Sequence, residues 1–402
     1  MLGLYIGIIL LLNIPYVQHR MSVLVAKELS TVLGSELTVG RINIGLLNRI
    51  IIDDLVLNDQ SGKELLKIGR LSAKFEILPL FSGKISIGNV QLFSFNANLE
   101  RPTPQASTNF QFVLDAFASK DTVKKKSNLD LRINSLLIRR GKVSYDVLSA
   151  ESTPGKFNPQ HIRLSNILAN ISLKALQNDS VNAAIKRMSV EEEHSGFELK
   201  KLSLKIIAND RKMRIENFAI DLPNTSLAMD TIRMEYDSLE SLGHFTDDVR
   251  FSFRMLPSEV ALQDISAFVP AFKPFKEKLK LEMEAAGTVN RLNCPKLLIS
   301  SNDHFLLKGN VSLQDLSHPQ DAYIFGNLSN LYADPDGIAF FVRNLSKDYK
   351  GVPPVLQNLG TVSFRGEISG YFTDLVTYGE VRTDIGTIKT DVKLSSDKDK
   401  GY

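Results

Sequence analysis

Residues 82–101 read SGKISIGNVQLFSFNANLER, and apolar and polar side chains alternate along this stretch. Alternation with a period of two is typical of a β-strand that presents one apolar face. The apolar positions change phase twice, and the successive sets are Ile85 and Ile87, then Val90 and Leu92, then Phe93, Phe95, Ala97 and Leu99. A change of phase indicates an inserted residue, so we expect long strands interrupted by β-bulges or tight turns.

The same period continues through most of the chain after Glu36, and we expect roughly twenty strands, far more than an ordinary sheet contains. Further alternating sets are Leu71, Ala73, Phe75 and Ile77; Leu129, Leu131 and Ile133; Ile167, Ala169, Ile171 and Leu173; Val249, Phe251, Phe253 and Met255; and Leu279, Leu281, Met283 and Ala285. Short polar turns separate the runs, which predicts antiparallel pairing. Phase changes near Gly40, Gly69 and Gly88 predict bulges there.

Few segments have a helical period. Residues 109–117 predict one or two amphipathic turns, and residues 257–269 predict a helix capped by Ser258. Residues 334–345 predict a third helix, with Asp334 as its cap and Pro335 in its first turn. Three short helices cannot cover the apolar faces of so many strands.

An antiparallel sheet with one apolar face must shield that face from water. Three arrangements satisfy this requirement: two sheets packed around a dry protein core, a closed barrel, and a long open groove whose apolar lining is covered by something other than protein. The groove suits lipid, because exposing a sixteen-carbon acyl chain to water costs on the order of 10 kcal/mol. Twenty strands would extend such a groove over roughly 90 to 100 Å. The sequence therefore predicts a mainly β protein with a long antiparallel β-groove, or β-taco.

The N-terminus predicts a different environment. Residues 2–17 carry no charge, so we expect residues 1–20 to form a transmembrane anchor, although the run is slightly shorter than the ~20 apolar residues of a typical span. A cleaved signal peptide is the alternative, but the segment lacks a basic start and a small-x-small cleavage site. Residues 21–35 predict a short amphipathic helix that stops at Gly34.

Composition and motifs argue against an enzyme. The six histidines are scattered, and no metal-binding, nucleotide-binding or nucleophile motif occurs, so we expect no catalytic residues, no metal and no cofactor. The single cysteine, Cys294, is expected to be a small apolar strand residue. A net charge of +3 gives no support for a nucleic-acid partner. An enzyme acting on an envelope polymer is a further hypothesis, but it would need converging polar groups.

The order of these features resembles a known family. Residues 37–102, LTVGRINIGLLNRIIIDDLVLNDQSGKELLKIGRLSAKFEILPLFSGKISIGNVQLFSFNANLERP, followed by TNFQFVLDAF at 108–117, are similar to the N-terminal region of the TamB family, within the AsmA-like repeating β-groove proteins. Residues 366–394 are similar to the repeated groove strands of that family. The resemblance implies an AsmA/TamB-like N-terminal β region at 36–117, a loop at 118–128 and continuing groove repeats at 129–402.

The resemblance also implies a location and a function. It implies a single-pass protein of the bacterial inner membrane, with most of the chain in the periplasm, that moves phospholipid toward the outer membrane along its groove. The alternative is a translocation and assembly module subunit that aids outer-membrane protein insertion by β-strand pairing. Family members are usually longer, so we expect an N-terminal fragment, with any outer-membrane barrel partner contacted by a C-terminal region not present here.

Candidate lipid-groove residues come from the alternating sets. They are Leu71, Ala73, Phe75, Ile77, Phe93, Phe95, Ala97, Leu99, Val249, Phe251, Phe253, Leu279, Leu281 and Met283. Ordinary sheet core is the alternative for each of them, because the face on which a strand residue lies depends on its register.

Overall fold

The computed structural model describes residues 7, 10–45, 48–75, 85–117, 129–130, 134–177, 180–275, 277–301, 304–318, 321–345, 352, 354–371 and 374–395. It divides into two compact units, residues 1–175 with 183–202 and residues 176–182 with 203–402, and each is described by itself. The protein is mainly β, with one large sheet and few short helices, as the alternating pattern predicts. The predicted loop at 118–128 and groove candidate Ile77 lie outside the described residues.

The first unit is a sheet with two helices. Its strands are β1 (Leu37–Gly45), β2 (Arg49–Asn58), β3 (Glu64–Phe75), β4 (Ile85–Arg101), β5 (Leu129–Asp130), β6 (Ser135–Val147) and most of β7 (His161–Gln177). Strands β1 to β4 pair antiparallel in chain order, and β7 pairs antiparallel with β6. Strand β4 instead runs parallel to β6 and, for two residues, to β5, so the prediction of purely antiparallel pairing is wrong here. The connection from β4 to β6 contains helix α4 (Gln111–Phe117), since parallel strands need a crossover.

The phase changes of the sequence have a conformational cause. Asp54 in β2 and Ser94 in β4 have φ values of 54° and 54°, in the left-handed region. The registers place Asp54 between Gly40 and Gly69, and Ser94 opposite Gly69. A left-handed residue shifts the alternation of its strand by one position. The apolar residues that precede it and those that follow it in the sequence therefore lie on the same face of the sheet. Pairing stays one-to-one across Gly40 and Gly69, so the bulges predicted there are wrong and the phase changes come from kinks. The bulge predicted near Gly88 is confirmed by a register shift between β3 and β4.

The N-terminal helix differs from the prediction. No helix among the described residues is long and apolar enough to cross a membrane. Residues 1–6, 8 and 9 of the expected anchor at 1–20 lie outside the described residues. Helix α2 spans Pro15–Leu33, without a boundary at residue 20, and ends at Gly34 in a left-handed C-cap. The Asn13 side chain donates a hydrogen bond to the carbonyl of Ile44 at 2.8 Å, which ties the start of this helix to β1.

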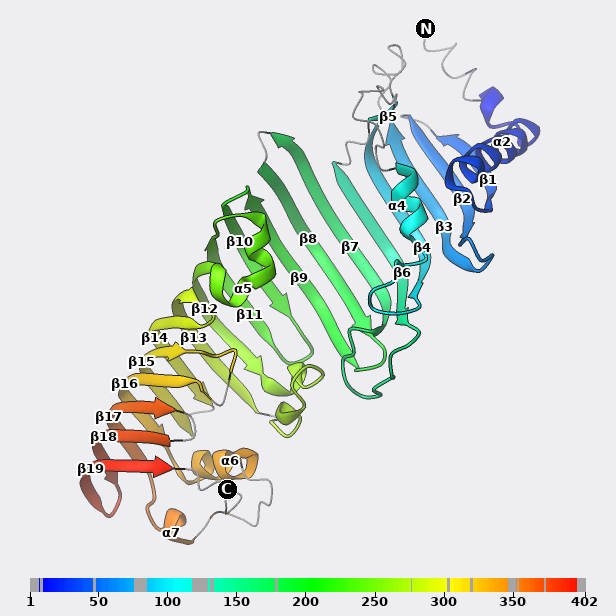
Figure 1. Ribbon diagram of the computed structural model, residues 1–402. Coiled ribbons are helices and arrows are strands. Elements are labelled where there is room, and N and C mark those ends of the chain that lie inside the picture. Colours follow the sequence, from blue (N-terminus) through cyan, green and yellow to red (C-terminus); the bar gives the residue numbers. More distant parts are fainter. Residues whose placement is uncertain are drawn as a thin grey trace. The chain divides into compact units, whose positions relative to one another are not determined.

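Helices α2 and α4 cover one end of the apolar face of the first unit (Figure 1). The buried residues Leu33, Leu37, Leu57 and Leu65 form a core against which Phe110 and Val113 pack. Helix α2 also closes the edge of β1, because the Ser30 hydroxyl accepts a hydrogen bond from the Leu37 amide at 2.9 Å. An edge strand closed in this way cannot add a further strand.

The second unit is an antiparallel meander. Its strands are β10 (Lys212–Asp221), β11 (Ser226–Glu235), β12 (Arg250–Ala261), β13 (Lys278–Thr288), β14 (Arg291–Ser301), β15 (Phe305–Gln314), β16 (Tyr323–Ala333), β17 (Val362–Tyr371), β18 (Asp374–Thr383) and β19 (Gly386–Ser395). Each pairs with the next in chain order. Strands β8 (Ser180–Glu192) and β9 (Phe197–Ala208), like β7, are divided between the two units.

Helices in the second unit are short and lie at strand ends. They are η1 (Leu239–His244), α5 (Phe245–Asp248), η2 (Leu262–Ile265), η3 (Pro270–Phe272), α6 (Pro335–Leu345) and α7 (Pro354–Gln357). The prediction of α6 is confirmed, and the Asp334 carboxylate caps it by accepting a hydrogen bond from the Gly337 amide at 2.8 Å. The helix predicted at 257–269 is wrong, because β12 continues to Ala261 by pairing with β13. Ser258, its expected cap, accepts a hydrogen bond from the Ala228 amide of β11 instead.

Candidate functional site: an apolar sheet face

One face of the second unit is apolar from β10 to β19. Residues directly opposite each other in neighbouring strands share a face of the sheet, so the registers trace rows across it. One row contains Met213, Met234, Phe251, Gly287, Leu292, Leu313, Ile324, Gly370 and Leu375. A second contains Met229, Met255, Met283, Leu297, Gly309, Leu328, Gly366, Gly379 and Thr390. A third contains Leu281, Ile299, Leu307, Leu331, Phe364, Val381 and Ile388.

Most side chains of this apolar face are only half-buried. Phe251, Phe253, Leu281 and Ile299 keep part of their surface exposed, whereas a core residue of a sandwich is almost fully buried. Among the described elements, α5 contacts β13 and stacks its Phe245 ring on Phe251 of β12, and α6 contacts β16, so these helices cover only a small part of the sheet. The apolar face is therefore continuous over ten strands, and the described residues form no second layer over it.

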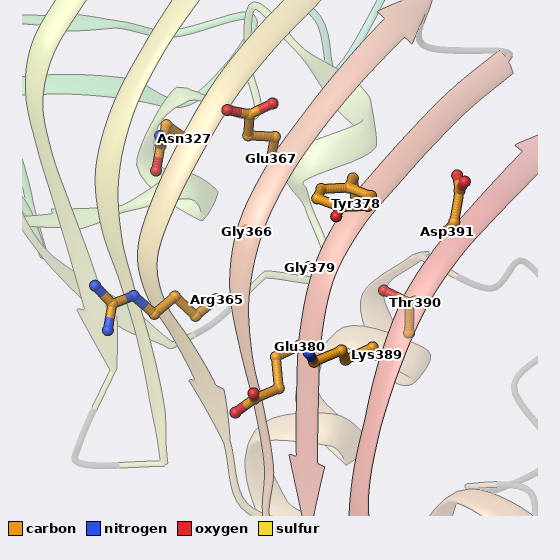
Figure 2. A pocket seen from close by; sticks show the side chains of 10 residues that line it. All are labelled: Asn327, Arg365, Gly366, Glu367, Tyr378, Gly379, Glu380, Lys389, Thr390 and Asp391. Carbon is orange, nitrogen blue, oxygen red and sulfur yellow. The ribbon is translucent and has the colours of Figure 1, made fainter.

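The opposite face of the same strands is polar and carries ion pairs. Arg254 and Asp230 are 3.1 Å apart, and Lys296 and Glu282 are 2.7 Å apart. A shallow hollow on β16 to β19 shows the character of this face (Figure 2). The carboxylates of Glu367, Glu380 and Asp391 point away from one another there, so they do not form a catalytic pair.

Glycines in the apolar rows are covered by an aromatic ring. Gly366 and Gly379 lie opposite each other in β17 and β18. A Cβ atom on Gly366 would lie 2.9 Å from the Phe364 ring, and one on Gly379 would also lie 2.9 Å from it. The Phe364 ring therefore occupies the space above both glycines.

The first unit has a smaller apolar face of the same kind. Its rows are Ile50, Ala73, Val90, Leu136 and Ile171; Ile52, Leu71, Leu92, Ile138 and Ala169; and Leu55, Ile68, Phe95, Gly141 and Ile167. A fourth row, with Leu57, Leu66 and Ala97, borders the core that α2 and α4 cover.

Most of the predicted groove residues lie on these apolar faces. The registers bring together Leu71, Ala73, Phe95 and Ala97 in the first unit, and Phe251, Phe253, Leu279, Leu281 and Met283 in the second. Leu99 packs against the core formed with α2 and α4, so protein covers it. Phe75 ends β3, where its Cα atom lies opposite Ile87.

Two predicted groove residues are placed elsewhere. Phe93 lies opposite Arg70, on the polar face, because the left-handed Ser94 reverses the alternation after it. The Arg139 guanidinium lies 6.0 Å from the centre of the Phe93 ring. Val249 precedes β12 and is fully buried at 0% exposure, so it lines no open surface.

Five methionines lie together on the apolar face, and the sequence analysis did not predict this grouping. Met213 and Met234 are paired, and Met229, Met255 and Met283 are successive members of one row. The sulfur atoms of Met283 and Cys294 are 3.9 Å apart, and burial raises the pKa of the Cys294 thiol. Methionine is flexible and polarizable, so this part of the face can adapt to ligands of different shape. The alternation within each strand indicates on which face its methionine lies. Only the pairing registers of the strands show that the five methionines are neighbours.

Buried carboxylates in the described residues have structural roles. Burial alone would raise the pKa of Glu192, but hydrogen bonds from Ser195 and from the Arg163 and His194 amides outweigh it and lower the pKa. Glu192 therefore closes the turn between β8 and β9. Within the described ranges, no group of three or more His, Cys, Asp or Glu side chains could hold a metal ion.

Comparisons with known proteins give no assignment: no family model, no curated protein and no solved structure matches this chain.

Proposed function

We propose that this protein holds phospholipid acyl chains on its apolar sheet face and moves phospholipid along it. The observation that carries the proposal is the continuous apolar face of β10 to β19, which is half-buried and over which the part of the chain that the structure describes forms no second layer. Nine spacings of about 4.8 Å make this face about 43 Å long measured along the sheet. Acyl chains lying on it would supply the missing layer, while headgroups remain in water.

The resemblance to the TamB and AsmA-like proteins supports the same proposal and adds a setting. In that setting the protein is attached to the bacterial inner membrane, extends into the periplasm and passes phospholipid toward the outer membrane. No enzymatic activity, metal or cofactor forms part of this proposal.

A substitution pair on β12 and β13 tests the proposal. Phe251→Asp combined with Leu281→Asp places two carboxylates on the apolar face, where an acyl chain cannot solvate them. We expect phospholipid bound to the purified full chain, measured by native mass spectrometry, to fall several-fold. The matched control is Ser252→Asp with Ser300→Asp, two residues on the opposite face of β12 and β14.

The control variant should retain the phospholipid of the wild-type protein. Equal phospholipid in the wild-type protein and in a folded Phe251→Asp, Leu281→Asp variant would contradict the proposal. Circular dichroism of both variants establishes that the sheet is intact.

Strand pairing with outer-membrane proteins is the second candidate function. Helix α2 closes the edge at β1, whereas β19 pairs with β18 and with no other strand of the described residues. An incoming strand would therefore pair with β19 by β-augmentation. This function makes no use of the apolar rows, so it predicts equal lipid content in the two variants above.

A further inference from the structure

The polar face of the first unit carries a concentrated positive charge. We define the basic face as the polar side of β1 to β6 between the row of Arg49 and the row of Lys142. Its basic residues are Arg41, Arg49, Lys67, Arg70, Lys74, Arg139, Arg140 and Lys142, and its acidic residues are Asp53 and Asp54. Eight basic and two acidic side chains give a formal charge of +6, although the whole chain carries +3.

The few ion pairs on the basic face leave it strongly positive. Asp53 is buried between Arg70, at 2.6 Å, and Arg41, at 3.3 Å. The side chains of these two arginines remain 54% and 59% exposed, so each guanidinium can still reach an external anion. Lys67, Arg139, Arg140 and Lys142 are exposed as well. On the polar face of the second unit, acidic residues pair with Arg214, Arg254 and Lys296.

Arginine side chains are held in place on the basic face. Arg139 lies over the Phe93 ring, and Arg140 lines a shallow hollow together with Gly69, Arg70 and Ser94. A guanidinium group that is held in place loses less entropy when it binds a phosphate, and it can donate two hydrogen bonds. The chemistry of this face therefore suits phosphate groups.

A lipid bilayer presents phosphate groups over a broad surface. The basic side chains are likewise spread over four strands of one sheet face, so their charge is complementary to an anionic bilayer surface.

We propose that the basic face docks the first unit on the surface of an anionic phospholipid bilayer. Each basic side chain near such a surface adds to the attraction, and salt screens it. This inference concerns the polar side of the sheet and does not rest on lipid binding by the apolar rows.

Vesicle flotation with the full chain tests the docking surface. The probes are vesicles of phosphatidylcholine alone and vesicles of phosphatidylcholine and phosphatidylglycerol in equal parts. We expect tighter binding to the anionic vesicles and a loss of this preference at high salt. Lys67→Glu, Arg139→Glu and Lys142→Glu together should weaken binding to the anionic vesicles by about tenfold or more, without changing binding to phosphatidylcholine.

The control reverses three exposed charges of the second unit, Lys273→Glu, Lys278→Glu and Lys308→Glu, and should keep the preference. Equal binding to both vesicles by the wild-type protein, or an equal loss in the control variant, would overturn the inference. Binding to double-stranded DNA that is as tight as binding to anionic vesicles would also overturn the inference.

Phospholipid bound to the purified charge-reversed variant should stay unchanged, which separates this test from that of the proposed function.

Discussion

Asp53 shows how a single residue sets the charge of a sheet face. Burial alone would raise the pKa of its carboxyl group, but the hydrogen bonds and positive charges of Arg70 and Arg41 outweigh burial and lower the pKa. The carboxylate is thus ionised at neutral pH and holds two arginines on neighbouring strands. Hydrogen bonds between charged groups contribute more to stability than neutral ones.

Replacing Asp53 with Asn removes the charge and keeps the shape. We expect Asp53→Asn to lower the free energy of unfolding by about 1 to 3 kcal/mol at neutral pH. Because the folded-state pKa is lowered, this contribution is present above the unfolded pKa and is lost as pH falls through the folded pKa. Urea unfolding of both proteins, from neutral pH to about pH 3, should show the difference shrinking with acidification.

The matched control for this prediction is Asp54→Asn. Asp54 is the exposed neighbour of Asp53, and Asn tolerates its left-handed backbone. Its effect should be small and independent of pH. A difference between Asp53→Asn and the wild-type protein that stays constant down to acidic pH would contradict the role assigned to the carboxylate.

At the scale of the elements, a line of kinks crosses the strands of the first unit. Left-handed residues mark it in four strands, at Asp54, Ser94, Arg140 and Asn166. Beside this line, the Phe95 ring of β4 covers Gly141 of β6 so closely that a Cβ atom on Gly141 would lie 2.2 Å from the ring. The absence of a side chain at Gly141 therefore lets β4 and β6 pair where both strands bend.

Gly141→Ala is expected to destabilise the first unit, because the methyl group and the Phe95 ring occupy the same space. Overpacking of this kind costs about 1 to 3 kcal/mol, which urea unfolding would measure. Gly243→Ala is the control, since a Cβ atom there meets nothing within 4 Å. The smaller side chain of Phe95→Leu should restore part of the stability to Gly141→Ala. Unchanged stability in Gly141→Ala would show that the ring does not hold this position.

At the scale of the whole molecule, the sequence predicts the class of fold well. Alternation with a period of two identifies the strands, and Asp334 and Gly34 mark ends of α6 and α2. The face of each residue is harder to predict, because one left-handed residue such as Ser94 moves every following side chain to the other face. Pairing with β13 likewise extends β12 through a segment whose local period is helical.

The basic face shows a second limit of sequence reasoning. Its residues come from four strands, separated by as many as 101 positions between Arg41 and Lys142, and a net charge of +3 averages them with the rest of the chain. Only the registers bring them onto one surface. Composition alone therefore gave no indication of an anionic partner.

The central claim is that lipid covers the apolar sheet face, and site-specific photocrosslinking in cells tests it most directly. A benzophenone side chain would replace Phe251, Ser252, Phe253 and Arg254 of β12 in turn. The account predicts phospholipid adducts from positions 251 and 253 and none from 252 and 254. Adducts with no dependence on the face, or crosslinks from 251 and 253 to the chain itself in place of lipid, would contradict it.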